Sequence, residues 1–169
     1  MFQLESLTER DKSTSYQWLL EQLKSLTQDE PNMIANLANI SSLLFWQLED
    51  VNWAGFYLRE GDQLVLGPFH GKPACIRIPL GKGVCGIAAD TGQVQRVADV
   101  HQFTGHIACD ADTNSEIVLP IKKQGQVKAV LDIDSPAVDR FDEQDQAGLL
   151  AIAYYIEKQL WFKGKDTKN

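Results

Sequence analysis

The hydrophobic positions of the first fifty residues follow a helical repeat. Two stripes recur at intervals of three and four residues, which is the spacing of amphipathic helices. The first consists of Tyr16, Leu19, Leu20, Leu23 and Leu26, and the second of Ile34, Leu37, Ile40, Leu44 and Leu48. The second stripe starts just after Pro31, a residue that suits a first helical turn. We therefore expect two helices within residues 12–49.

After Asp50 the pattern changes to the two-residue alternation of strands. Three segments separated by Gly, Asp and Pro turns predict a β-meander: "VNWAGFYL" (51–58), "QLVLGPF" (63–69) and "ACIRIPL" (74–80). A short helix closed by Gly92 is predicted next, followed by a fourth strand: "GKGVCGIAADTG" (81–92) and "VQRVA" (94–98).

The last third of the chain predicts a hairpin and a helix. Two strand patterns flank Gln124-Gly125, a hairpin signal: "EIVLPI" (116–121) and "VKAVLDID" (127–134). A helical stripe follows behind an acidic first turn within residues 141–162, made of Leu149, Ile152, Ala153, Ile156 and Leu160. The sequence thus predicts an α+β fold, with sheet and loops over residues 51–135 and helices packed against the sheet.

Composition narrows the function classes. The 169 residues suit one domain, and 16 basic against 23 acidic residues give a net charge of −7. This charge disfavours nucleic acid and anionic membranes as partners. The sequence shows neither a secretory leader nor an apolar run approaching the ~20 residues that span a bilayer, so we expect a cytoplasmic protein. Three cysteines without a CxxC pair make a structural disulfide framework improbable.

The hairpin register predicts a cluster of carboxylates. A loop of odd length keeps the apolar faces of both strands together, with Ile117, Leu119 and Ile121 opposite Ile133, Leu131 and Ala129. The same register brings Glu116 opposite Asp134 on the other face, with Asp132 two residues away. At least one of these acids should have a raised pKa and can donate a proton, while the others can bind an ammonium group. The alternative is that they simply face water, and Pro120 indicates an edge or a bulge.

Aromatic residues and thiols supply further candidates. Trp53 and Tyr57 share a strand face with Gly55, which leaves either a gap for a ligand or plain core. The turn before Cys85 can bind a carboxylate or a phosphate through its N–H groups, and the helix N-terminus favours that thiol as a nucleophile. Cys109 lies among acids instead, so the residues alone leave the ranking of the thiols open.

Metal binding is the weaker interpretation of the third cysteine. His106 and Cys109 have the spacing of half a zinc site, and His70 and His101 are also near cysteines in the sequence. The sequence offers no second half with suitable spacing. We therefore predict no metal and no cofactor.

Four segments together resemble the free methionine-(R)-sulfoxide reductases, enzymes built on a single GAF domain. They are "NWAGFYL", "ACIRIPLGKGVCGIAA", "GHIACDADTNSEIVLPI" and "VLDIDSP". The resemblance runs from about residue 31 to 161 and includes all three cysteine positions, which makes it more specific than likeness to GAF domains in general. It implies one GAF domain over residues 1–169.

The resemblance also implies a mechanism. Cys109 would be the nucleophile, Cys75 the main resolving thiol and Cys85 an accessory one. The pocket for free methionine-(R)-sulfoxide would be formed by Trp53, Tyr57, Glu116, Asp132 and Asp134. Glu116 would protonate the sulfoxide oxygen, and thioredoxin would be the reductant.

Two other function classes remain as alternatives. A non-catalytic GAF sensor would bind a small ligand such as a cyclic nucleotide and signal through its helices, and a structural zinc protein would use the histidines. The sequence does not decide whether the chain forms a homodimer through its flanking helices.

Overall fold

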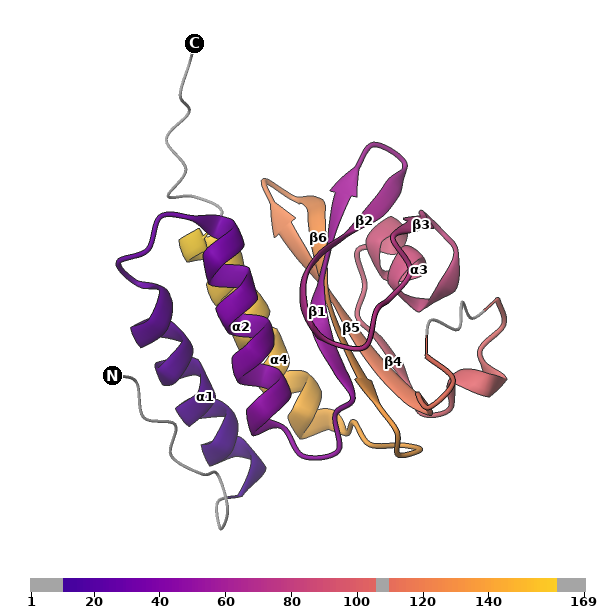
Figure 1. Ribbon diagram of the computed structural model, residues 1–169, viewed down its shortest axis with the longest axis horizontal. Helices are drawn as coiled ribbons and strands as arrows, with labels where there is room; N and C mark the ends of the chain where they lie inside the picture. The colour runs from indigo at the N-terminus through magenta and orange to yellow at the C-terminus, as the bar shows by residue number, and fades with distance from the viewer. Residues whose placement is uncertain (1–10, 106–109, 161–169) are drawn as a thin grey trace.

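A six-stranded antiparallel sheet lies between two layers of helices (Figure 1). The computed structural model describes residues 11–105 and 110–160, with side chains up to residue 158. The strands are β1 (Trp53–Glu60), β2 (Gln63–Gly71), β3 (Arg77–Pro79), β4 (Gln95–Val97), β5 (Ser115–Lys123) and β6 (Gln126–Ser135). Their order in the sheet is β3-β2-β1-β6-β5-β4, so the predicted meander of β1, β2 and β3 is confirmed.

Four α-helices cover the sheet. They are α1 (Lys12–Thr27), α2 (Met33–Gln47), α3 (Gly83–Thr91) and α4 (Glu143–Tyr155); a 3-10 turn (Val100–Gln102) precedes β5 and a π-helical turn (Ile156–Leu160) continues α4. Helices α2 and α4 pack on one face, α1 lies on their outer side, and α3 covers the other face (Figure 1). The architecture is the predicted α+β arrangement. Within the described residues, every helix is too short or too polar to cross a bilayer.

Helix α2 differs from its predicted stripe at one end. It is capped by Asn32, whose side chain accepts from the backbone N–H of Ala35, and it begins at Met33. Leu37, Ile40 and Leu44 are buried as predicted, whereas Ile34 is 53% exposed. At about 100° per residue, Ile34 lies roughly 105° from the centre of the buried face. The inclusion of Ile34 in the stripe was therefore wrong, and Leu43 is the buried residue that it missed.

The β5–β6 hairpin has the predicted pairing with a different turn. Ile117, Leu119 and Ile121 pair with Ile133, Leu131 and Ala129, and all six belong to the core under α2 and α4. The turn itself is the even two-residue Gln124-Gly125, and one extra residue in β6 shifts the register between Ile121 and Lys122. Because of this β-bulge, an odd number of residues separates Ile121 from Ala129, as the alternation of apolar residues requires. Pro120 lies just past the last β5 residue that pairs with β4, where a missing N–H is tolerated.

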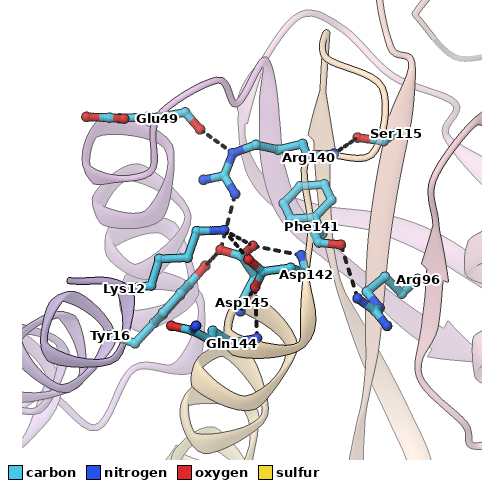
Figure 2. Close-up of polar contacts among 10 residues, drawn as sticks. All are labelled: Lys12, Tyr16, Glu49, Arg96, Ser115, Arg140, Phe141, Asp142, Gln144 and Asp145. Atoms are coloured by element: carbon cyan, nitrogen blue, oxygen red, sulfur yellow. Dashed lines mark hydrogen bonds and ion pairs between the residues drawn. The ribbon is translucent and has the colours of Figure 1, made fainter.

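A buried ionic network fastens the helices on that face (Figure 2). The carboxylate of Asp145 in α4 accepts from the Tyr16 hydroxyl at 2.9 Å, from Lys12 Nζ at 2.7 Å and from the Arg140 guanidinium at 3.1 Å. Arg140 also donates to the carbonyl of Glu49, just beyond α2. The network joins α1 to α4 and to the end of α2, away from the face that α3 covers.

Candidate active site

Three acidic side chains meet on the face of the sheet opposite α2 and α4. Glu116 in β5 pairs directly with Asp134 in β6, and Asp132 lies two residues from Asp134 on the same face. Glu116 and Asp132 are each 6% exposed, and Asp134 is half-buried. The predicted convergence of the three carboxyl groups is confirmed, and the alternative that they simply face water is excluded for Glu116 and Asp132.

Burial shapes the protonation of this cluster. It raises the pKa of Glu116 well above its ordinary value, and the neighbouring charges of Asp132 and Asp134 raise it further. Burial together with Asp132 and Asp110 does the same for the pKa of Asp134. Burial raises the pKa of Asp132 to about 6, and hydrogen bonds with Cys85 and Glu116 limit this rise. Three carboxyls at this spacing therefore retain protons at pH values where exposed acids are ionised.

Cys85 lies beside the carboxyl cluster, in the first turn of α3. Its side chain is buried, and its Sγ lies 3.8 Å from Oε1 of Glu116. Burial raises the pKa of this thiol well above its ordinary value, and the charges of Asp132 and Glu116 act in the same direction. The expectation that the helix N-terminus activates Cys85 was wrong, because burial and the acids outweigh the helix dipole.

Two aromatic rings form a wall above the carboxyl cluster. Trp53 and Tyr57 in β1 have ring centroids 5.9 Å apart with an angle of 23° between their planes. The indole N–H donates to the carbonyl of Lys72 at 3.1 Å, and the phenol donates to the carbonyl of Cys75 at 3.0 Å. These two bonds fix the rings against the segment between β2 and β3.

The gap predicted over Gly55 is filled by side chains. A Cβ on Gly55 would lie 2.3 Å from Cβ of Phe69 and 2.7 Å from Cη2 of Trp53. The rings of Phe69 and Trp53 stack with centroids 5.2 Å apart. The glycine therefore admits the indole ring instead of a ligand, so of the two alternatives the packed core holds at Gly55. Both rings are nevertheless buried and line the cavity described next.

A cavity of about 40 Å³ joins these groups. Its floor carries the three carboxyls and Cys85, its wall carries Trp53 and Tyr57, and Gly83 and Val84 of α3 form another side. All five side chains of the predicted substrate pocket thus line one cavity: Trp53, Tyr57, Glu116, Asp132 and Asp134.

The mouth of the cavity includes Lys72, a residue that sequence reasoning missed. Lys72 forms ion pairs with Asp110, at 3.2 Å, and with Asp112. The amide of Asn52 donates to Thr113 Oγ1 at 3.1 Å. These contacts tie the segment after residue 109 to the start of β1 and the end of β2. The acidic residues around Cys109 indicated that this segment belongs to the site, whereas no sequence signal placed Asn52 and Lys72 there.

The other predicted thiols differ in what the structure describes. Cys75 is half-buried and disulfide-bonded, and Cys85 is the free cysteine among the described residues. Cys109 lies outside the described residues, as does His106 of the half zinc site considered above. The carboxylate-binding role of the turn before α3 stays a prediction: Gly81 and Lys82 donate their N–H groups to Gly86 and Pro79.

Comparison with known proteins gives consistent matches. The model of the GAF domain family matches residues 35–158. Free methionine-R-sulfoxide reductase of Escherichia coli is 53% identical over 150 residues, which cover 89% of this chain and 91% of the relative. Two solved structures with substrate are also similar. That of fRMsr of Staphylococcus aureus is 56% identical with a TM-score of 0.82, covering 86% of this chain and 95% of the other. That of free methionine-R-sulfoxide reductase from Neisseria meningitidis is 40% identical with a TM-score of 0.90, covering 95% and 96%.

Proposed function

The chain belongs to the free methionine-R-sulfoxide reductases of the GAF domain family, and from this membership we propose that it reduces free L-methionine (R)-sulfoxide to methionine. The observation that carries the proposal is the cavity whose floor is three carboxyl groups and whose wall is two aromatic rings. A free amino acid offers an ammonium group to the acids and a methyl-sulfur end to the rings. Methionine within a polypeptide has no such ammonium group.

The charge of the cavity disfavours the alternative of a cyclic-nucleotide sensor. A phosphate would meet three carboxyls on the floor, and Lys72 is the cationic side chain among the described residues that line the cavity. Lys72 already pairs with Asp110 and Asp112 at the mouth. Asp132, whose pKa is raised only to about 6, is ionised at neutral pH and repels an anion, so an anionic ligand is a poor match.

The reaction transfers one oxygen atom to the protein. In the proposed step the Cys109 thiolate attacks the sulfoxide sulfur, and the S–O bond of the substrate breaks while a proton is added to the oxygen. The oxygen then forms a bond to the sulfur of Cys109 as the transient sulfur–sulfur bond breaks. Methionine leaves, reduced by two electrons, and Cys109 is left as a sulfenic acid, oxidised by two. The step needs a proton donor close to the oxygen. Without a proton the oxygen would leave the sulfur as an anion, which is a poor leaving group.

Glu116 is the proposed proton donor. Its carboxyl is buried on the cavity floor, and its raised pKa keeps the proton available near neutral pH. Asp132 and Asp134 would hold the ammonium group of the substrate. Trp53 and Tyr57 would enclose the methyl-sulfur end.

The remaining thiols would complete the cycle. Cys75 attacks the sulfenic sulfur of Cys109, water leaves, and a disulfide forms; thioredoxin then supplies two electrons and two protons to restore both thiols. The disulfide-bonded state of Cys75 supports its role as the resolving thiol. The raised pKa of Cys85 makes it a slower nucleophile, which supports an accessory role.

A thioredoxin-coupled assay tests the proposal. We expect turnover of the free (R)-sulfoxide and little turnover of the (S)-sulfoxide or of an N-acetylated substrate, which lacks the ammonium group. Cys109→Ser should abolish turnover. The control Ala111→Ser adds a hydroxyl at an exposed position two residues away and should retain it.

Mass spectrometry gives a second reading of the same proposal. One equivalent of the free (R)-sulfoxide, added to the reduced protein without reductant, should yield one equivalent of methionine and a Cys75–Cys109 disulfide. Full activity of Cys109→Ser, or unchanged thiols after exposure to the sulfoxide, would refute the proposal.

A further inference from the structure

One thiol sulfur and two carboxylate oxygens converge on the floor of the cavity. One ligand atom each from Cys85, Glu116 and Asp132 lies within 4.8 Å of the other two. Cys85 Sγ and Glu116 Oε1 are 3.8 Å apart. Two ligands of one zinc ion, at about 2.3 Å for sulfur and about 2.0 Å for oxygen, lie at a similar separation in a tetrahedral site. The three side chains need little movement to contact one ion.

The donors come from elements that hold them in place. Cys85 belongs to α3, Glu116 to β5 and Asp132 to β6, and all three side chains are buried. Both strands lie inside the sheet, and α3 packs on them. A site built on such elements loses little conformational entropy when a ligand binds.

An unpaired atom at this place points to a missing ligand. Oδ1 of Asp132 is buried and has no hydrogen-bond partner among the described residues, although Asp132 is only 6% exposed. Buried polar atoms in native proteins are nearly always satisfied, and an unsatisfied carboxylate oxygen attracts a cation or a strong donor. Lys72, the cationic side chain among the described lining residues, is paired at the mouth.

We propose that Cys85, Glu116 and Asp132 form a binding site for a thiophilic divalent cation of the zinc class. Sulfur selects zinc or cobalt over magnesium and calcium, which prefer all-oxygen sites. Two carboxylates and one thiolate complete three positions of a tetrahedron and leave the fourth open toward the cavity. A cation there occupies the space that a ligand reaching the floor would need. The site also differs from the half zinc site considered in the sequence, because it uses no histidine.

Cobalt binding tests this site independently of the reductase activity. The parent is the full-length chain with Cys75→Ser and Cys109→Ser, so that Cys85 is the remaining thiol. Titration with Co²⁺ should produce a thiolate-to-cobalt charge-transfer band and the visible absorption of a tetrahedral ion. X-ray absorption of the zinc-loaded parent should show one sulfur at about 2.3 Å and oxygens at about 2.0 Å.

Variants of the parent locate the ion. Cys85→Ser should remove the charge-transfer band, and Glu116→Gln and Asp132→Asn should each weaken Co²⁺ binding at least tenfold. Asp110→Asn, which alters an acid at the mouth of the same cavity, is the matched control and should bind within threefold of the parent. Circular dichroism confirms that each variant is folded.

A measurement on the unsubstituted chain guards against misfolding of the variants. Zinc should slow the alkylation of Cys85 in the reduced protein at least tenfold, as followed by mass spectrometry of the peptide that contains it. A zinc shell without sulfur, a charge-transfer band that survives Cys85→Ser, or alkylation of Cys85 that zinc does not slow would overturn the proposal. None of these results bears on sulfoxide reduction, so the two proposals fail separately.

Discussion

At the scale of single residues, the protonation state of Glu116 governs the proposed chemistry. Its raised pKa means that the side chain still carries a proton at pH values where an exposed glutamate is ionised. Glu116→Gln removes the transferable proton and keeps the shape, so kcat should fall by about 10²–10⁴. The alkaline fall in the pH profile of kcat that reports Glu116 losing its proton should also disappear.

Substitution of Asp134 should separate the effect on substrate binding from the effect on proton donation. Asp134→Asn weakens the proposed contact with the ammonium group, so it should raise KM more than it lowers kcat. Glu143→Gln makes the same kind of change at an exposed position in α4 and serves as the control. The pH dependence of kcat is measured between pH 6 and 9 for Glu116→Gln and for the control Glu143→Gln. The same pH profile for both variants would contradict the assignment of Glu116 as proton donor.

The acid cluster also lowers the stability of the fold at neutral pH. Burial raises the pKa of Asp132 from 3.8 to about 6, so the folded protein retains a proton that the unfolded chain releases. The resulting destabilisation is absent below pH 3.8 and complete above about pH 6. Asp132→Asn removes it and should raise the free energy of unfolding by about 3 kcal/mol at pH 8, and by roughly half as much at pH 5. Urea denaturation at the two pH values measures the difference, and a variant less stable than wild type at pH 8 would disprove this account.

At the scale of elements, the hairpin shows what alternation can predict. The apolar face of β5 has one energetically acceptable partner face in β6, so the pairing of Glu116 with Asp134 followed from the sequence alone. The bulge that allows an even turn did not, because alternation fixes which faces meet and not where an extra residue is accommodated. The exposure of Ile34 depends likewise on how far around α2 the sheet extends.

Helix α3 depends on a close approach that only glycine allows. A Cβ on Gly86 would lie 2.4 Å from the carbonyl oxygen of Pro79, and the Gly86 carbonyl accepts from the N–H of Gly81 at 2.9 Å. Gly86→Ala should therefore push α3 from the turn after β3 and lower the free energy of unfolding by about 1–3 kcal/mol. Because Gly83, Val84 and Cys85 of α3 line the cavity, a shift of the helix should also weaken binding of the sulfoxide.

An exposed position on the same helix provides the control for Gly86. Asp90→Ala raises helix propensity and does not alter the contact between residue 86 and Pro79, so it should leave stability unchanged or raise it by up to about 0.5 kcal/mol. Urea unfolding compares the two variants. Equal stabilities would show that the contact with Pro79 does not restrict residue 86.

At the scale of the whole molecule, one face of the sheet packs the main core and the other carries the cavity. The face under α2 and α4 is a hydrocarbon core, and the opposite face combines a second apolar cluster with the buried acids. The hairpin acids could be predicted because they are local partners. The contact between Cys85 and Glu116 could not, because it depends on how α3 packs across the sheet and brings together residues 31 positions apart. The same tertiary packing reverses the pKa shift expected of Cys85 from its helix.

The separation of the two faces predicts that stability and binding can be altered independently. Tyr16 donates its hydroxyl to the carboxylate of Asp145, and the two residues are 5% and 1% exposed (Figure 2). Tyr16→Phe removes a buried hydrogen bond to a charged group, so it should lower the free energy of unfolding by about 1.5–3 kcal/mol. KM for the sulfoxide should stay unchanged, because the network lies across the sheet from the cavity.

A surface ion pair on α1 provides the control for the stability change expected of Tyr16→Phe. Lys24 and Glu21 pair at 2.7 Å with side chains that are 41% and 67% exposed, so Lys24→Gln should change the free energy of unfolding by less than about 0.5 kcal/mol. Urea unfolding and steady-state kinetics of both variants at one pH provide the comparison. If Tyr16→Phe unfolds at the same urea concentration as Lys24→Gln, the network contributes no more than a surface pair. If instead Tyr16→Phe changes KM several-fold, the two faces are coupled through the sheet, because no side chain of the network lines the cavity.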